Sequence, residues 1–225
     1  MHVTICRLTL HENLFYATRE IGRLYETGRY LHNYGLTYAL EFAVAPYFNT
    51  TALPRYAEDL GALNQQEVYV TPAQPIAVAF ELNTFKYADN RYRVKMELSS
   101  RNTPSFGRAK ELATGSTFQF VILCNKPMRK MPTWIRLGKW MSKAAVEITH
   151  EETIDKVNTS EFTSAFPLNP LDLPPETRLL TYDLISMPPV SLLDNVQLTG
   201  AYYRLSDQRK SCIPAGLAYR FPGGG

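Results

Sequence analysis

Two tryptophans and six cationic side chains lie close together between residues 126 and 143. The segment contains no Asp or Glu, and Trp134 and Trp140 are interleaved with the cations Lys126, Arg129, Lys130, Arg136, Lys139 and Lys143. Cationic groups neutralise phosphates, and an indole ring can stack on an unpaired base. The combination predicts a site for single-stranded RNA on a hairpin that bends at Gly138. A place in the core is an equally good interpretation of Trp134, whereas Trp140, beside the bend, is harder to bury.

The same region dominates the charge distribution of the chain. Residues 91–143 hold 12 of the 24 Lys and Arg residues and only two acids, so the segment carries +10 and the rest of the chain −7. A basic surface on an acidic body is the electrostatic pattern of a protein that binds polyanions. Solvated strand faces would give the same pattern. The bases outside the hairpin are candidate contacts to a DNA duplex: Arg91, Arg93, Lys95, Arg101 and Arg108.

His32 is the candidate for acid–base chemistry, since a metal-independent ribonuclease needs a histidine general base with Tyr or Lys nearby. Tyr30 and Tyr34 flank it. The alternative, which we favour, is a histidine at the start of a helix that packs or makes a hydrogen bond. The chain has no P-loop, GxSxG or HExxH motif. We therefore expect no catalytic residue and no enzymatic activity.

Metal-binding patterns are weak in this sequence. The acidic residues Glu147, Glu151, Glu152 and Asp155 could hold the metal ions of a nuclease, but a solvated turn is the favoured interpretation. The three cysteines are far apart and lack zinc-site spacing, and Cys6 and Cys124 are expected to be buried small hydrophobes. We expect no metal and no cofactor. Isolated cysteines, and the absence of a signal-peptide pattern and of a long apolar run, predict a cytoplasmic protein without a membrane partner.

Hydrophobic periodicity and turn residues predict a strand-rich α+β chain. Strands are expected over residues 3–10, 76–85, 92–98, 117–124, 133–137, 143–149 and 196–205, and helices over 30–45 and near 56–63. Residues 99–116 are expected to form a basic loop, and 163–189 to run extended over the surface. The order strand, helix, strand, strand near the N-terminus is the first part of a ferredoxin-like unit.

Four stretches resemble one family: LYETGRYLHNYGLTYAL at 24–40, PTWIRLGKWMSKAAVE at 132–147, YDLISMPPVSLLDNVQLTG at 182–200 and IPAGLAYRF at 213–221. On these residues the chain resembles the type I-D CRISPR Cascade subunits of the Cas-five (Csc-one) family, within the RAMP superfamily. The resemblance implies a single domain over 1–225. It would comprise a ferredoxin-like (RRM-like) RAMP core at 1–124 and extended β-hairpin insertions at 125–225.

The resemblance also implies a non-catalytic role. Such subunits bind the 5′ handle of the CRISPR RNA and cap the filament of backbone subunits. They contact the large subunit near the protospacer-adjacent motif of double-stranded target DNA, where base pairing with the guide reads the sequence. Carried onto this chain, the family places the WIRLGKW hairpin and the helix start with His32 and Tyr34 nearest the RNA.

Two alternatives stay open. The chain could be a metal-independent endoribonuclease that processes CRISPR repeat RNA, with His32 as its base. It could also be a structural RAMP subunit whose basic face meets acidic protein partners.

Overall fold

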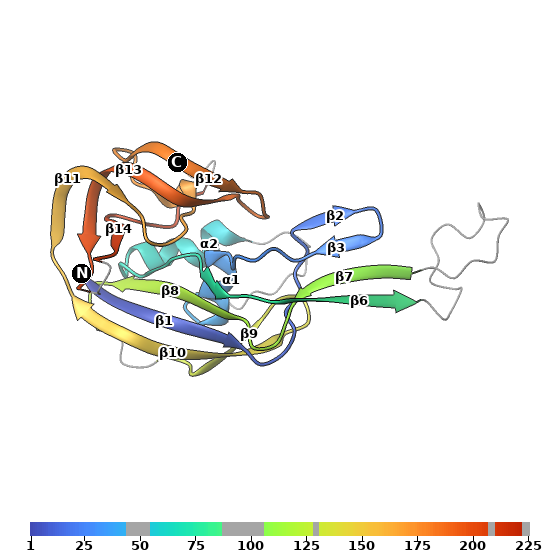
Figure 1. Ribbon diagram of the computed structural model, residues 1–225. Coiled ribbons are helices and arrows are strands. Elements are labelled where there is room, and N and C mark those ends of the chain that lie inside the picture. Colours follow the sequence, from blue (N-terminus) through green and yellow to red (C-terminus); the bar gives the residue numbers. More distant parts are fainter. Residues whose placement is uncertain (44–54, 87–105, 128–130, 207–209, 222–225) are drawn as a thin grey trace.

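The computed structural model describes residues 1–43, 55–86, 106–127, 131–206 and 210–221 (Figure 1). The strand predicted over 92–98 lies outside these residues. The chain forms a central sheet with two short helices beside it, a second sheet above it in the view of Figure 1, and a third sheet that extends sideways as an arm.

The central sheet is built around β1 (His2–Leu10), which pairs antiparallel with both β8 (Thr117–Cys124) and β10 (Ser142–Thr153). The outer strands are β4 (Tyr69–Val70) and β5 (Gln74–Ala77), which pair with β8, and β9 (Trp134–Leu137), which pairs with β10. Helices α1 (Asn33–Ala39) and α2 (Tyr56–Gly61) and the 3-10 helix η1 (Ala62–Asn64) lie between β1 and β4 in the chain.

The spatial order β10-β1-β8-β4 is that of a ferredoxin-like sheet. The helices form the first crossover. In a ferredoxin-like unit a second helix would connect β8 to β10. Among the described residues of that connection there is a strand, β9, which pairs with β10 at the edge of the sheet. The resemblance implied a core at 1–124 and insertions at 125–225. The central sheet contains strands from both of these parts.

The two faces of the central sheet are covered to different extents. Side chains alternate along a strand, and the even-numbered Leu8 and Phe120 share a hydrophobic cluster with Leu36 of α1. The odd-numbered Val3 and Val121 pack instead in a cluster with residues of the second sheet. Further along the odd face, Arg7 is exposed and Gln119 is half-buried. In β1 and β8 one face is thus buried along its length, and the other is open at the end near the β9–β10 turn.

The second sheet has the order β11 (Lys156–Thr163), β13 (Leu192–Arg204) and β12 (Arg178–Ile185), and β14 (Cys212–Pro214) also pairs with β13. Phe162 and Leu198 on its inner side pack in the cluster that contains Val3. In the described part of the chain, β12 pairs only with β13, and it exposes three large apolar side chains, Leu180, Tyr182 and Leu184.

The arm consists of β2 (Arg19–Ile21), β3 (Leu24–Glu26), β7 (Phe106–Leu112) and β6 (Phe80–Lys86), in that order. The prediction of a loop over 99–116 was wrong where β7 lies. That strand pairs with β6 along its whole length and with β3 in parallel. Its backbone groups are satisfied by two neighbouring strands, so it needs no apolar alternation of its own. The strand predicted over 76–85 is likewise divided between β5 and β6, in two different sheets.

Three other predicted segments differ from the structure. The helix predicted over 30–45 begins at Asn33 and ends at Ala39, and Glu41, with φ at 63°, lies in a backbone conformation outside the helix. The turn predicted for the carboxylates after Val146 is confined to Asp155, because Glu147, Glu151 and Glu152 lie in β10, which continues to Thr153. The segment 163–189 contains strand β12. The strands predicted over 3–10, 117–124 and the β9–β10 hairpin are confirmed.

A fully buried carboxyl group, that of Asp172, connects four distant segments of the chain. Asp172 belongs to the 3-10 helix η4 (Pro170–Asp172). Its Oδ2 accepts hydrogen bonds from Asn33 Nδ2 at 2.8 Å and from the Tyr69 hydroxyl at 2.9 Å, and its Oδ1 accepts one from the backbone N–H of Arg220 at 3.1 Å. Burial, opposed by these hydrogen bonds, raises the pKa of Asp172 to about 6 from 3.8.

This shift predicts an unusual pH dependence of stability. In the unfolded chain Asp172 loses its proton near pH 3.8, and in the folded chain near pH 6. Between these values the folded state binds more protons, so the free energy of unfolding falls as the pH rises, by about 3 kcal/mol in total. Denaturant titrations at pH 3.5 to 7.5 should show this fall for the wild type relative to Asp172→Asn.

Asp183→Asn, which removes an exposed carboxyl group of β12, is the matched control. A difference between wild type and Asp172→Asn that stays constant with pH would contradict the prediction.

Candidate nucleic-acid interface

The β9–β10 hairpin presents one exposed polar face. In its register Arg136 is opposite Lys143 and Trp134 is opposite Ala145. Trp134 and Arg136 are exposed, whereas the alternate residues Ile135 and Leu137 are buried in the cluster beneath. Arg7 of β1 lies on the same side of the sheet. We call Arg7, Trp134, Arg136 and Lys143 the hairpin face. It occupies the open end of the central sheet.

The cations of the hairpin face lie close to the Trp134 ring. The Arg136 Cζ is 5.7 Å and the Lys143 Nζ 5.5 Å from the ring centroid, a distance at which a cation is attracted to the face of an indole. Trp134 is 52% exposed, so it does not lie in the core, which was the other interpretation of this residue. An exposed indole with two cations beside it can stack on a base while the cations contact phosphates.

Glu12 contacts the Arg136 side chain and the backbone of Lys143. Its Oε2 lies 3.3 Å from Arg136 Nη1 and accepts a hydrogen bond from the backbone N–H of Lys143 at 2.7 Å. Arg136 Nη1 also donates to the backbone carbonyl of Met141 at 3.0 Å. A guanidinium group has five N–H donors, so these contacts leave Arg136 with capacity for a phosphate.

The turn of the hairpin is anchored to the segment after β1. The backbone N–H of Lys139 donates to the carbonyl of Phe15 at 2.9 Å, and the rings of Trp140 and Phe15 stack with centroids 4.5 Å apart. Gly138 has φ at 71°, and a Cβ there would lie 2.6 Å from the Phe15 carbonyl oxygen and 2.5 Å from Leu14 Cδ1. Only glycine permits both this backbone conformation and this close approach.

The helix start predicted to lie near RNA is next to the hairpin, but its two side chains are buried. His32 and Tyr34 line a groove of about 1410 Å³ between α1, β9 and residues 187–189. His32 is 8% exposed and Tyr34 is 2% exposed. The Nδ1 of His32 accepts the backbone N–H of Tyr34 at 3.2 Å and so caps α1. Burial lowers the pKa of His32 to about 4. These are the features of a packed helix-capping histidine, the alternative favoured from the sequence.

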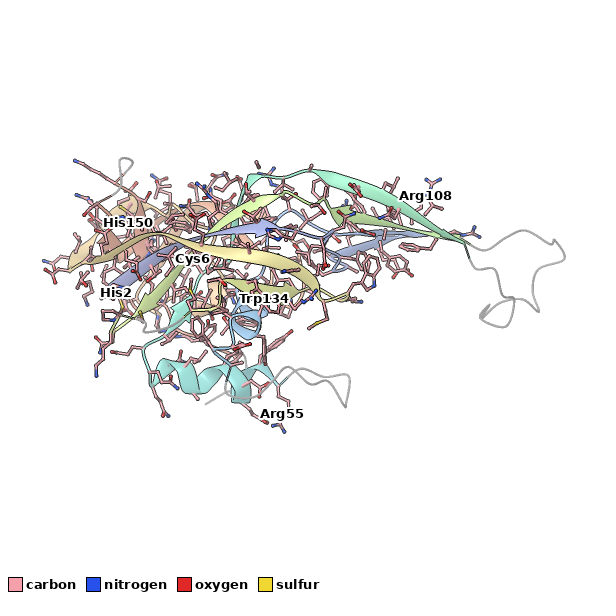
Figure 2. All side chains as sticks on the ribbon, turned by 90° about the horizontal axis from the view of Figure 1, so that it is seen from below. His2, Cys6, Arg55, Arg108, Trp134 and His150 are labelled. Atoms are coloured by element: carbon pink, nitrogen blue, oxygen red, sulfur yellow. The ribbon has the colours of Figure 1, made fainter. Side chains whose placement is uncertain are left out.

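The remaining candidates are dispersed. Lys126 is exposed beyond Cys124, at the end of the sheet where β8 pairs with His2, whereas the Gly138 turn lies at the Leu10 end. Figure 2 shows Arg108 on the arm, away from Trp134 in the body. Arg91, Arg93, Lys95, Arg101, Arg129 and Lys130 lie outside the described residues.

The described part of the chain shows neither a cluster of metal ligands nor a membrane-spanning helix. No group of three or more His, Cys, Asp or Glu side chains there is placed to hold a metal ion. No helix among those residues is long and apolar enough to cross a membrane. Cys6 and Cys124 are buried, as predicted.

Three residues of the site were missed from the sequence, Arg7, Glu12 and Phe15. They lie more than a hundred positions before the hairpin, which Glu12 and Phe15 contact, in a segment whose local pattern marks no binding function. Only the pairing of β1 with β10 brings them there.

The chain was compared with known proteins. The family model for type I-D CRISPR-associated protein Cas5/Csc1 matches residues 1–222. No curated protein matches. Among solved structures, a chain of the type III-B Cmr-beta complex bound to cognate target RNA and AMPPnP is 9% identical, with a TM-score of 0.45. The match covers 88% of this chain and 86% of that one.

The anchored turn predicts unequal effects of two glycine substitutions. Gly138→Ala and Gly115→Ala both place a side chain at a positive φ, which costs about 1–2 kcal/mol. Around Gly115, at φ 83°, no atom lies within 4 Å of the added Cβ, whereas at Gly138 the added Cβ meets the Phe15 backbone. Gly138→Ala should therefore lower the free energy of unfolding more than Gly115→Ala, as measured by denaturant titration. Equal losses would mean that the turn is not held against Phe15.

Proposed function

Because the chain belongs to the type I-D CRISPR-associated Cas5/Csc1 family, we propose that it is a non-catalytic, RNA-binding subunit of a type I-D CRISPR effector complex. Its ligand in this proposal is the single-stranded 5′ handle of the CRISPR RNA. The observation that carries the proposal is the hairpin face, where the cross-strand pair Arg136 and Lys143 lies beside the exposed Trp134 ring.

The hairpin face suits a single strand better than a duplex. A base of a single strand can leave the stack and lie on Trp134, a contact with a typical value of about 1–3 kcal/mol. The phosphates on either side then meet Arg136, Lys143 and Arg7, with Lys139 at the turn. Glu12 holds the Arg136 guanidinium in place before the RNA arrives, which reduces the entropy lost on binding.

Family membership also supports a place within an assembly. In the proposal the chain caps the filament of backbone subunits and contacts the large subunit near the protospacer-adjacent motif of target DNA. The exposed apolar side chains of β12 are compatible with a protein neighbour. Arg108 on the arm is a candidate contact to the DNA duplex.

The proposed role does not include RNA cleavage. A general base must reach the proton that it removes, and His32 is buried with its Nδ1 engaged by the backbone of Tyr34. Incubation of the purified protein with CRISPR repeat RNA and a chelator should therefore give no specific products. Site-specific cuts that disappear in His32→Ala would establish the nuclease alternative instead.

Charge reversal on the hairpin face should weaken RNA binding. With about four phosphates neutralised, the log of the affinity for single-stranded RNA should fall against log salt with a slope of about −3. Arg136→Glu with Lys143→Glu removes two of these contacts, so the slope should fall to about −1.5 and the affinity should drop. Fluorescence anisotropy of a labelled handle RNA at several salt concentrations measures both quantities.

The matched control is Lys156→Glu with Arg178→Glu, the same charge change at exposed positions of the second sheet. An equal loss of affinity in both double variants would show that only the net charge matters. A slope near zero in the wild type would contradict the proposed function.

A further inference from the structure

A second, smaller pocket lies where the arm joins the body, on the far side of the hairpin turn. Its volume is about 550 Å³, within the range of about 300–1,000 Å³ typical of sites for small organic groups. It is lined by residues of the turn, of β3, β6 and β7, and of the segment after β1. We call it the junction pocket. Its wall includes the aromatic rings of Tyr25, Phe85 and Trp140 and the cation of Lys139.

The aromatic rings of the junction pocket are held in place but not buried. Phe15 covers one face of the Trp140 indole in a stack of 4.5 Å, and the Phe85 ring lies edge-on to Trp140 at 5.9 Å. Even so, Trp140 is 50% exposed and Phe85 46% exposed. Because Phe15 occupies one face of Trp140, a ligand ring can stack only on the other face. Large exposed rings grouped in a concave site are typical of a binding surface.

The chemistry of the wall favours a base attached to a phosphate. Flat rings bind the π-face of any base, and a cation at the rim meets the phosphate. Lys139 supplies that cation. It is exposed, and it lines both the junction pocket and the groove beside β9. Arg19 is already paired with Glu26, so it contributes less. At Gly107 the wall has no side chain, which leaves room for a ring.

Lys139 connects the junction pocket to the hairpin face. It lines this pocket and also the groove that Trp134 and Arg136 line. A strand whose phosphates follow Arg136 and Lys143 can thus cross the turn at Lys139 and reach the pocket.

We propose that the junction pocket takes up one unstacked base of the bound RNA strand, stacked on the open face of Trp140 beside Phe85. This inference rests on the proposed function, since it assigns a further base of the same RNA to a site of its own. Trp134 and Trp140 then hold different bases on the two sides of the turn.

The two tryptophans of the chain make the pocket directly observable. In Trp134→Phe, Trp140 is the sole tryptophan, and the ring at position 134 is kept. Saturation with a single-stranded hexauridylate should quench its fluorescence, whereas a hexameric abasic ribose-phosphate of equal charge should not. Adding Phe85→Ala should weaken hexauridylate binding about tenfold, because it removes the ring that lies beside the stacked base. Phe85 is exposed, so this change is compatible with folding.

Anisotropy of labelled hexauridylate, measured in parallel, separates the two hypotheses. Hexauridylate could bind normally while Trp140 fluorescence stays unchanged and Phe85→Ala has no effect. That result would overturn the binding of a base in the junction pocket and leave the proposed function intact. Equal quenching by the abasic hexamer would also overturn it, because no base is then needed. No binding by the wild type or any variant would overturn the proposed function itself. Trp140→Phe, which leaves Trp134 as the reporter, shows whether the hairpin face is occupied in the same titration.

Discussion

The carboxyl group of Asp172 is the point on which the arrangement of the sheets depends. It joins Asn33 at the start of α1, Tyr69 of β4 and Arg220 near the C-terminus, and the neighbouring Tyr219 hydroxyl adds hydrogen bonds with Thr37 and with the backbone N–H of Val70. Burying a charge is costly unless hydrogen bonds compensate it, and here three donors converge on two oxygens. This contact fixes α1, whose Leu36 and Leu40 pack in the same cluster as Ile135 and Leu137 of β9. The inner side of the hairpin thus has a rigid support.

The hairpin turn shows how a close backbone contact can position a binding surface. Gly138 lets the chain approach Phe15 so closely that the Lys139 N–H reaches its carbonyl. That approach brings Phe15 under Trp140, while the strands before and after the turn present Trp134, Arg136 and Lys143. Rings held on a sheet lose little conformational entropy when a ligand arrives. The positions of both tryptophans therefore depend on a residue that has no side chain.

Elements with a local signal could be predicted from the sequence, and elements made by pairing could not. The apolar run of β8 and the alternating side chains of β9 identify these segments as strands. The cations and tryptophans of the hairpin are also close together in the chain. β7 has no apolar alternation and is a strand only because β3 and β6 flank it. For the same reason the exposed end of β10 resembled a turn, whereas its pairing with β1 extends it to Thr153. Glu12 and Phe15 reach the site through that pairing, which no short window of sequence contains.

The free edge of β12 affects the solubility of the isolated chain. Within the described residues this strand pairs on one side only and displays Leu180, Tyr182 and Leu184. Unpaired N–H and C=O groups next to apolar side chains form a template on which other strands can add. Self-association through this edge competes with assembly, and its rate rises with concentration. A protein that pairs with this edge would remove the template, so the isolated chain should be more soluble when such a neighbour is made alongside it.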